Sequence, residues 1–195
     1  MRYSELNQLK EKLYFTSADL KEVLGITLAS AQVLCSRYVK KGIFVRLKNN
    51  FYILDSVWGN LSRGDILKIA NFLQVPSYIS FMTALSFYEV TTQVQRDFYE
   101  SVSLKRSISF GCRGVSFNFY KLKPEYYFGF EKMDDIFIAK KEKAFVDAVY
   151  LYSFGKYKLD FSSLDFGALD KDKVMEISKV FPQKTRNLLV KLCKI

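Results

Sequence analysis

The chain has 195 residues, a formal net charge of +10 and no histidine. Without imidazole, Ser-His-Asp and Cys-His catalysis and every His-dependent metal site are excluded. Cys35, Cys112 and Cys193 are widely spaced, so neither a disulfide framework nor a Cys-x-x-Cys metal site is expected. The positive charge favours polyanions such as nucleic acid. Since no apolar run reaches the length of a membrane span, we expect a soluble, cytoplasmic protein without a membrane partner.

Helical patterns occupy the first part of the chain. Residues 2–13 carry leucines at helical spacing and predict a short N-terminal helix. A second helix is expected to begin after Thr16 or Ser17, whose side chains can cap it. Gly25 is expected to end that helix, because this position requires a left-handed residue.

A third helix follows this turn. Ala31, Leu34 and Tyr38 recur at three- and four-residue spacing and predict its buried side, and the helix is expected to close at Gly42. The opposite side is polar and basic, with side chains that can donate to phosphates or read base edges. The candidate DNA-binding residues of this segment are Thr27, Ser30, Gln32, Arg37, Lys40 and Lys41.

Two runs of strand-forming residues, 43–46 and 51–54, are separated by four residues that end in two asparagines. Asparagine tolerates the left-handed conformation of a tight hairpin, so a small hairpin is predicted. Arg46, Lys48 and Asn49 would lie near its tip as further DNA contacts. Helix, turn, helix and basic hairpin predict a winged helix-turn-helix over residues 1–58. The alternatives are a protein-interaction module and a basic helix face that is only a solvated surface.

The remainder predicts an α+β domain over residues 76–195, after a connector at 59–75 that includes a helix near 62–74. Residues 55–60 read as a loop. Gly111 and Gly114 are expected to bracket a turn between the first two strands of a small, mostly antiparallel sheet. The predicted strands are 97–104, 115–122, 127–130 and 136–139, and the predicted helices are 140–152, 171–180 and 184–192.

No constellation predicts catalysis, a cofactor or a metal site, so we expect a binding protein and no enzyme. Asp170 and Asp172 are expected to favour the start of a helix, and Asp134 and Asp135 fit a turn. A second basic surface for nucleic acid or an acidic partner is possible, although a solvated face accounts for the same residues. Its candidates are Lys105, Arg106, Lys140, Lys141 and Lys143.

Three stretches resemble the AbiEi-type antitoxins of bacterial abortive-infection toxin–antitoxin systems, and they follow one another in the same order as in that family. Residues 42–54 are similar to the family pattern Gly-x-x-x-Arg-Leu-x-Arg-Gly-x-Tyr. Residues 76–88 are similar to Pro-Ser-Tyr-(Val/Ile)-Ser-x-x-Ser-Ala-Leu-x-x-Tyr, and residues 138–151 to Ile-Ala-x-x-Glu-Lys-Ala-Leu-x-Asp. Asn49 and Asn50 depart from the pattern where Arg-Gly is usual, so Lys48 would have to supply the charge of the hairpin.

The resemblance implies a transcriptional regulator whose winged domain binds operator repeats in double-stranded DNA and represses its own operon. It also implies a C-terminal domain that counteracts a nucleotidyltransferase-like toxin, with direct contact between the two proteins left open. The alternative is a winged-helix regulator with a ligand-sensing C-terminal domain and no toxin partner. The operator sequence, the toxin and the oligomeric state stay open.

Overall fold

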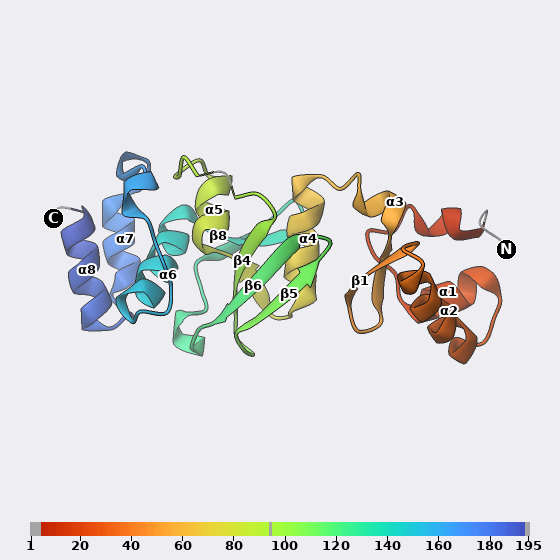
Figure 1. Cartoon of the computed structure of the whole chain (residues 1–195). Helices are drawn as coiled ribbons and strands as arrows, with labels where there is room; N and C mark the ends of the chain where they lie inside the picture. The colour runs from red at the N-terminus through yellow and green to blue at the C-terminus, as the bar shows by residue number, and fades with distance from the viewer. Residues whose placement is uncertain (1–4, 94, 194–195) are drawn as a thin grey trace. The chain divides into compact units, whose positions relative to one another are not determined.

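A computed structural model describes residues 5–93 and 95–193 and has an α+β fold (Figure 1). The described residues divide into two compact units, one within 1–69 and 110–115 and the other within 70–109 and 116–193. The first contains a short 3-10 helix, three helices and a two-stranded sheet before α4 (Arg63–Leu73), which runs into the second unit. These elements are η1 (Glu5–Leu9), α1 (Ser17–Leu24), α2 (Leu28–Lys40), β1 (Phe44–Lys48), β2 (Phe51–Leu54) and α3 (Asp55–Trp58).

Helix α1 has the predicted caps. Thr16 accepts a hydrogen bond from the Asp19 backbone, and the Asp19 carboxylate accepts one from the Thr16 backbone. This reciprocal arrangement satisfies two donors that the first turn of the helix leaves open. Gly25 ends the helix in the left-handed conformation, with φ of 61°. Both predicted signals are therefore confirmed.

Helix α2 buries one side in the core of the first unit. Ala31, Cys35 and Tyr38 lie on that side, and the Tyr38 ring meets the Phe44 ring edge-on at 5.0 Å between centroids. Phe15 packs edge-on against Phe44 at 4.8 Å. These aromatic contacts hold α2 against β1 and leave the opposite side of the helix to solvent.

Strands β1 and β2 form the predicted hairpin. Asn50 takes the left-handed conformation, with φ of 58°. Its side-chain oxygen accepts hydrogen bonds from the backbone nitrogen of Ser17 at 3.0 Å and from the Ser17 hydroxyl at 2.6 Å. Asn50 thus completes the turn as expected and also joins the hairpin to the start of α1.

Two expectations in this unit are wrong in detail. Residues 5–9 form a 3-10 helix in place of the predicted longer helix, whose first residues lie outside the described part. Residues 55–58 form the short helix α3 instead of a loop. This helix begins at the residue that directly follows β2.

Among the described residues a six-stranded sheet, most of which belongs to the second unit, has the order β5-β6-β4-β3-β8-β7. The β3–β4 and β7–β8 pairs are antiparallel, whereas β3–β8 and β4–β6 are parallel. The sheet is therefore mixed, with these four pairs divided equally between the two directions, where a mostly antiparallel sheet was expected. The strands are β3 (Ser77–Ile79), β4 (Phe98–Ser103), β5 (Ile108–Cys112), β6 (Val115–Lys121), β7 (Phe130–Met133) and β8 (Ile136–Ala139).

Two strand positions also differ from expectation. Residues 108–112 form β5, a strand that was not predicted, so the turn before Gly114 joins β5 to β6 and not the strands expected at 97–104 and 115–122. Residues 124–126 form a 3-10 helix, η2 (Pro124–Tyr126), and the predicted strand at 127–130 begins only at Phe130. Proline at the start of η2 has no amide proton for a sheet, which favours this local turn.

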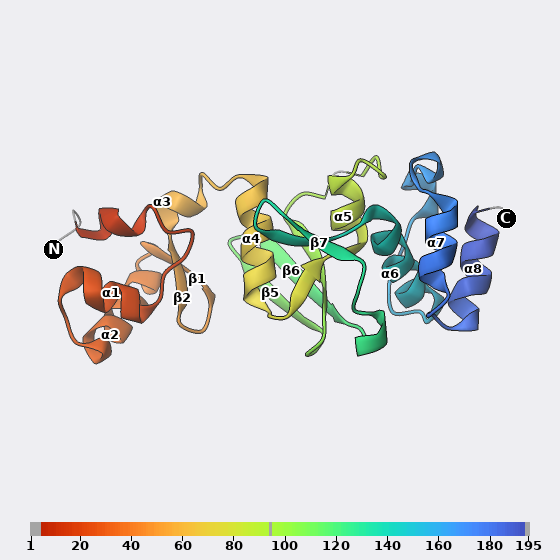
Figure 2. The same ribbon diagram turned by 180° about the vertical axis from the view of Figure 1, so that it is seen from behind.

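Helices complete the second unit. Helices α6, α7 and α8 pack together at the end that carries the C-terminus (Figures 1 and 2). Residues 142–149 of α6 are all buried, so this helix lies in the core of the unit and not at its surface. The helices are α5 (Phe81–Phe87), α6 (Lys141–Ser153), α7 (Lys171–Ser178) and α8 (Gln183–Cys193), with 3-10 turns η3 (Phe161–Ser163) and η4 (Phe166–Ala168).

Candidate nucleic-acid interface

The exposed side of α2 carries the main group of candidate contacts. Gln32, Arg37 and Lys40 are exposed, and their side chains form no hydrogen bond or ion pair with other described residues. They lie opposite the buried stripe of the helix. Because they are not held by neighbours, these groups can reach bases or phosphates without breaking an internal contact.

Thr27 and Ser30 are partly engaged at the start of the same helix. The Thr27 hydroxyl accepts a hydrogen bond from the Ser30 backbone at 3.2 Å and donates to the Ser30 hydroxyl at 2.9 Å. Thr27 is therefore the N-cap of α2, and this structural role explains the residue without a contact to DNA. Ser30 remains exposed and retains capacity for a further hydrogen bond.

Two apolar side chains on α2 were missed as candidates. Leu28 is 45% exposed and Val33 is 59% exposed. Val33 lines a shallow hollow together with Ala29 and Arg37. Apolar groups at such a position can contact the methyl group of thymine. Their signal in the sequence is that they fall between the buried positions of the helix, on the side assigned to polar contacts.

The hairpin supplies fewer free charges than its sequence indicates. The exposed Arg46 donates to the side-chain oxygen of Asn49 at 3.0 Å, so these two residues contact each other. The Lys48 ammonium lies 4.4 Å from the centre of the Phe51 ring, and Lys48 is half-buried. Lys41, directly after α2, is exposed. Arg46 and Lys41 are therefore the more available cations around α2.

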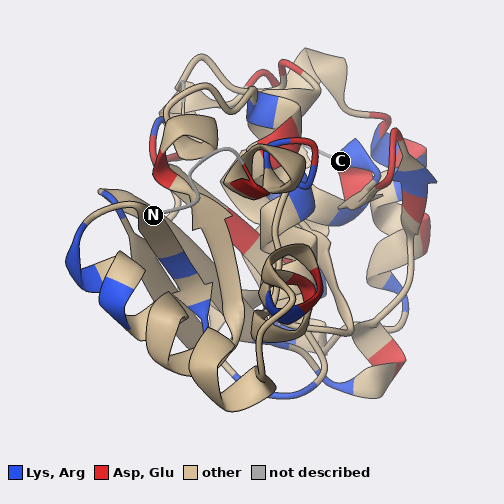
Figure 3. Cartoon of the chain, turned by 90° about the vertical axis from the view of Figure 1, so that its right-hand side faces the viewer, with Lys and Arg blue, Asp and Glu red and all other residues tan. Residues whose placement is uncertain are grey.

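The predicted second basic surface is only partly formed. Lys105, Arg106 and Lys140 are exposed, whereas Lys141 is half-buried and donates to the Ala168 carbonyl at 2.6 Å. Lys143 is fully buried, so its prediction as a surface contact is wrong. Basic positions occur on helices, strands and loops alike (Figure 3), so net charge alone does not define a surface.

Lys143 belongs to a buried polar network inside the second unit. Its ammonium contacts the Asp147 carboxylate one turn along α6 and donates to the Tyr78 hydroxyl at 2.9 Å. Asp147 also accepts from Tyr78 at 3.0 Å and from Ser80 at 2.9 Å. Burial lowers the pKa of Lys143 and raises that of Asp147, and the contact between the two groups opposes both shifts.

This network joins two stretches that are far apart in the sequence, residues 76–88 and 138–151. Tyr78 and Ser80 come from residues 76–88, and Lys143 and Asp147 come from residues 138–151. A buried charge is tolerated only when it is paired and hydrogen-bonded, which the four side chains achieve together. The network therefore holds β3 to α6 and has a structural role.

The acidic residues behave as expected from the sequence. Asp170 caps α7 by accepting from the Lys173 backbone at 3.1 Å, and Asp134 and Asp135 lie in the turn between β7 and β8. Within residues 5–93 and 95–193, no three or more Cys, Asp and Glu side chains gather in a group that could hold a metal ion. The same residues include no helix long and apolar enough to cross a membrane.

Comparisons with known proteins add nothing to these observations, since no family model, no curated protein and no solved structure matches the chain.

Proposed function

We propose that the first unit is a winged helix-turn-helix that binds double-stranded DNA. Helix α2 would enter the major groove, and the β1–β2 hairpin would lie against the neighbouring backbone. One observation carries this proposal: Gln32, Arg37 and Lys40 are exposed and unengaged on the side of α2 opposite its buried stripe. A helix that packs into the core by its apolar side and presents hydrogen-bond donors on its other side is suited to contact base edges in the major groove.

The roles of these side chains follow from their places on α2. Gln32 lies in its first half, where side chains of a recognition helix reach base edges. Arg37 and Lys40 lie in the last turn, where contact with phosphates is the simpler role. Lys41, Arg46 and Lys48 would add backbone contacts, and Thr27 and Asn49 would act mainly by shaping the helix start and the hairpin.

The wider proposal is an AbiEi-type antitoxin that represses its own operon from operator repeats and counteracts a nucleotidyltransferase-like toxin in the cytoplasm. It is supported by the three stretches of resemblance, which extend over both units. Lys105, Arg106 and Lys140 remain the exposed candidates for the toxin-related role of the second unit. No catalytic step is assigned to the protein itself.

A gel-shift experiment with the promoter that precedes the gene tests DNA binding. The full chain should shift this duplex at lower concentration than a random duplex of equal length. The variant Gln32→Ala/Arg37→Ala/Lys40→Ala should lose the shift. Gln8→Ala/Lys10→Ala/Lys21→Ala removes similar residue types from exposed positions outside α2 and should retain it. Equal binding by both triple variants would refute the assignment of α2.

Rescue in cells tests the antitoxin part separately. The proposal requires an adjacent gene for a nucleotidyltransferase-like protein, whose expression alone should arrest growth. Co-expression of the full chain should restore growth. The α2 triple variant should still rescue when it is expressed from a foreign promoter. Failure of the full chain to rescue would leave a DNA-binding regulator without a toxin partner.

A further inference from the structure

Two adjoining hollows occur in the second unit. One, of about 700 Å³, is lined by Phe98, Glu100 and Lys158 among others, and the second, of about 750 Å³, by Lys121 and Phe154 among others. Tyr120 and Lys156 line both. Each volume lies within the range of sites for small organic groups, roughly 300–1,000 Å³. The shared lining makes them neighbouring subsites.

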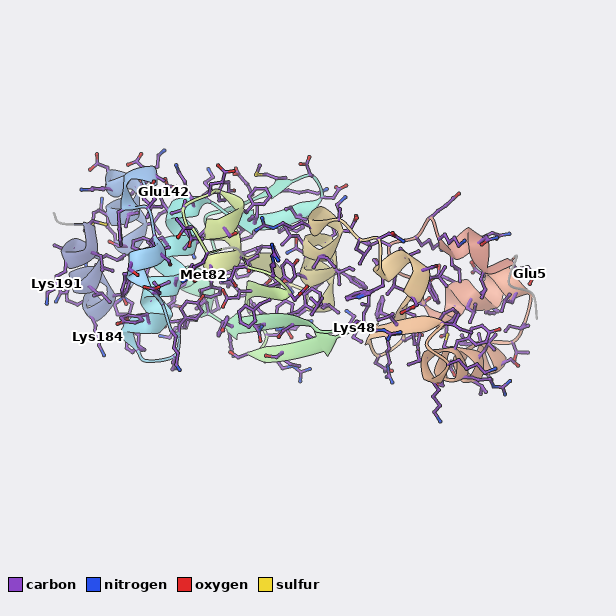
Figure 4. The ribbon with its side chains drawn as sticks, turned by 45° about the horizontal axis from the view of Figure 1, so that its top comes forward. Glu5, Lys48, Met82, Glu142, Lys184 and Lys191 are labelled. Atoms are coloured by element: carbon purple, nitrogen blue, oxygen red, sulfur yellow. The ribbon has the colours of Figure 1, made fainter. Side chains whose placement is uncertain are left out.

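The rims of these hollows carry more lysines than carboxylates, although the exposed Asp160 also lines the first hollow. Lys121, Lys156 and Lys158 are exposed and form no ion pair with any described carboxylate. Lys184, labelled in Figure 4, adds a fourth cation, with its ammonium 5.3 Å from the centre of the Phe154 ring. Several unpaired lysines around neighbouring hollows favour a ligand with more than one negative charge.

The walls present aromatic surface to solvent. Phe98 is 39% exposed and Phe154 is 44% exposed, although both are large apolar side chains. Phe98 lines the first hollow and Phe154 lines the second. An exposed ring beside a cation is suited to stacking with a flat, conjugated group.

Glu100 adds a polar group at the first hollow, beside Met82, which Figure 4 labels. One carboxylate oxygen accepts from the Tyr157 hydroxyl at 2.8 Å and from the Met82 backbone at 3.2 Å. The other accepts from the Tyr120 hydroxyl, at 3.4 Å. When Glu100 is ionised, above its raised pKa of about 7, its carboxylate can accept about four hydrogen bonds, so the second oxygen then retains capacity for an N–H of a ligand.

We propose that these hollows bind single-stranded nucleic acid, with one base in each hollow and the intervening phosphates on Lys121, Lys156 and Lys158. The bases would stack on Phe98 and Phe154, and a base with an amino group would donate to Glu100. A duplex does not fit, because its bases are stacked within the helix and cannot enter separate hollows. An acidic peptide could donate a backbone N–H to Glu100, but its carboxylate side chains offer no flat group to stack on the two rings. This site does not depend on duplex binding by α2.

Fluorescence anisotropy of the full chain with labelled twelve-nucleotide strands tests the proposal, with one arm of RNA and one of DNA. The variant Lys121→Ala/Lys156→Ala/Lys158→Ala should weaken single-strand binding at least tenfold. Its slope of log affinity against log salt should fall by about 2. The control Lys171→Ala/Lys179→Ala/Lys191→Ala removes the same charge from α7, its C-cap and α8, and should change affinity less than twofold. Equal losses in the two variants would overturn the site.

Further arms distinguish this site from binding at α2 and from a pocket for a single base. Phe98→Ala/Phe154→Ala should weaken binding roughly fivefold or more for each lost stack, whereas the exposed controls Phe137→Ala/Tyr152→Ala should not. Arg37→Ala/Lys40→Ala should leave single-strand binding intact, and loss of binding in this variant would move the site to α2.

A mononucleotide should bind at least tenfold more weakly than the strand, and equal affinity would refute two linked subsites. The RNA and DNA arms decide which strand is preferred.

Discussion

Lys143 and Asp147 form an ion pair one helical turn apart in α6, and neither side chain reaches solvent. Removing one member leaves the other charge buried without its partner. We expect Lys143→Met and Asp147→Ala each to destabilise the protein by roughly 3–5 kcal/mol. The double variant should lose less than the sum of the two. Urea unfolding of the four proteins measures this, and additive losses would contradict the coupling.

Salt dependence tests the proposed phosphate contacts of the first unit. Binding to the promoter duplex should fall by orders of magnitude between about 50 and 200 mM salt if Arg37, Lys40, Lys41, Arg46 and Lys48 meet phosphates. Arg37→Ala/Lys40→Ala should reduce the slope of log affinity against log salt by about 2. The control Lys10→Ala/Lys21→Ala, outside α2, should keep the slope of the parent. A slope near zero for the parent would refute the role of these side chains in phosphate binding.

Substitution of Gln32 tests whether α2 recognises the sequence of bases. Gln32→Ala should weaken binding to the promoter by roughly 1–3 kcal/mol if the side chain makes a bidentate contact with adenine. Binding to random duplex should change little, because that contact is sequence-specific. Competition gel shifts measure the two affinities side by side. A matched loss on both duplexes would assign Gln32 to positioning.

Local signals predict much of the first unit. The Thr16 cap and Gly25 lie within a few residues of the helix that they bound, so their effect does not depend on distant contacts. Asn50 likewise fits the turn from its own conformational preference. Its hydrogen bonds with Ser17 could not be predicted, because they join positions 33 residues apart.

The second unit is harder to predict, because its pairing is long-range. No local pattern indicates that β4 runs parallel to β6 or that β3 runs parallel to β8. A surface position is the natural expectation for Lys143, because charged side chains usually lie there. Helix α6 is buried on nearly every side, so helical periodicity could not identify an exposed face for Lys143.

The predicted second basic surface can be tested with the three of its residues that are exposed. Lys105→Glu/Arg106→Glu/Lys140→Glu should leave the free energy of unfolding within about 1 kcal/mol of the parent, because exposed charges contribute little to stability. It should weaken rescue of cells that express the toxin. Lys171→Glu/Lys179→Glu/Lys191→Glu makes the same charge change elsewhere in the unit and should rescue normally. Normal rescue by both variants would return these residues to a solvated role.

Glu100 predicts a stability change near neutral pH. Burial raises the pKa of its carboxyl group from 4.5 to about 7, although the hydroxyl groups of Tyr157 and Tyr120 and the Met82 backbone oppose this. Between these values the folded state binds more protons at Glu100 than the unfolded state, so its contribution to stability falls as pH rises. The loss should total about 3 kcal/mol above pH 7.

Glu100→Gln isolates this contribution, since it cannot titrate. Relative to the parent, the variant should gain stability between about pH 4.5 and pH 7.5 in urea unfolding. Glu176→Gln, at an exposed position of α7, should not change the pH dependence. Because the chain has no histidine, no imidazole contributes in this range. Parallel curves for the parent and Glu100→Gln would contradict the raised pKa.

The hydrogen bonds between Asn50 and Ser17 also bear on how the hairpin meets a partner. They join the turn of the hairpin to the first residue of α1, so the two elements form one preorganised body. A loop that must become ordered on binding loses conformational entropy at that moment. Here the turn is already ordered by an internal contact, and a glycine at this position would have no side chain to make it. The hairpin can therefore contribute to binding with little entropic penalty, even though it carries few free charges.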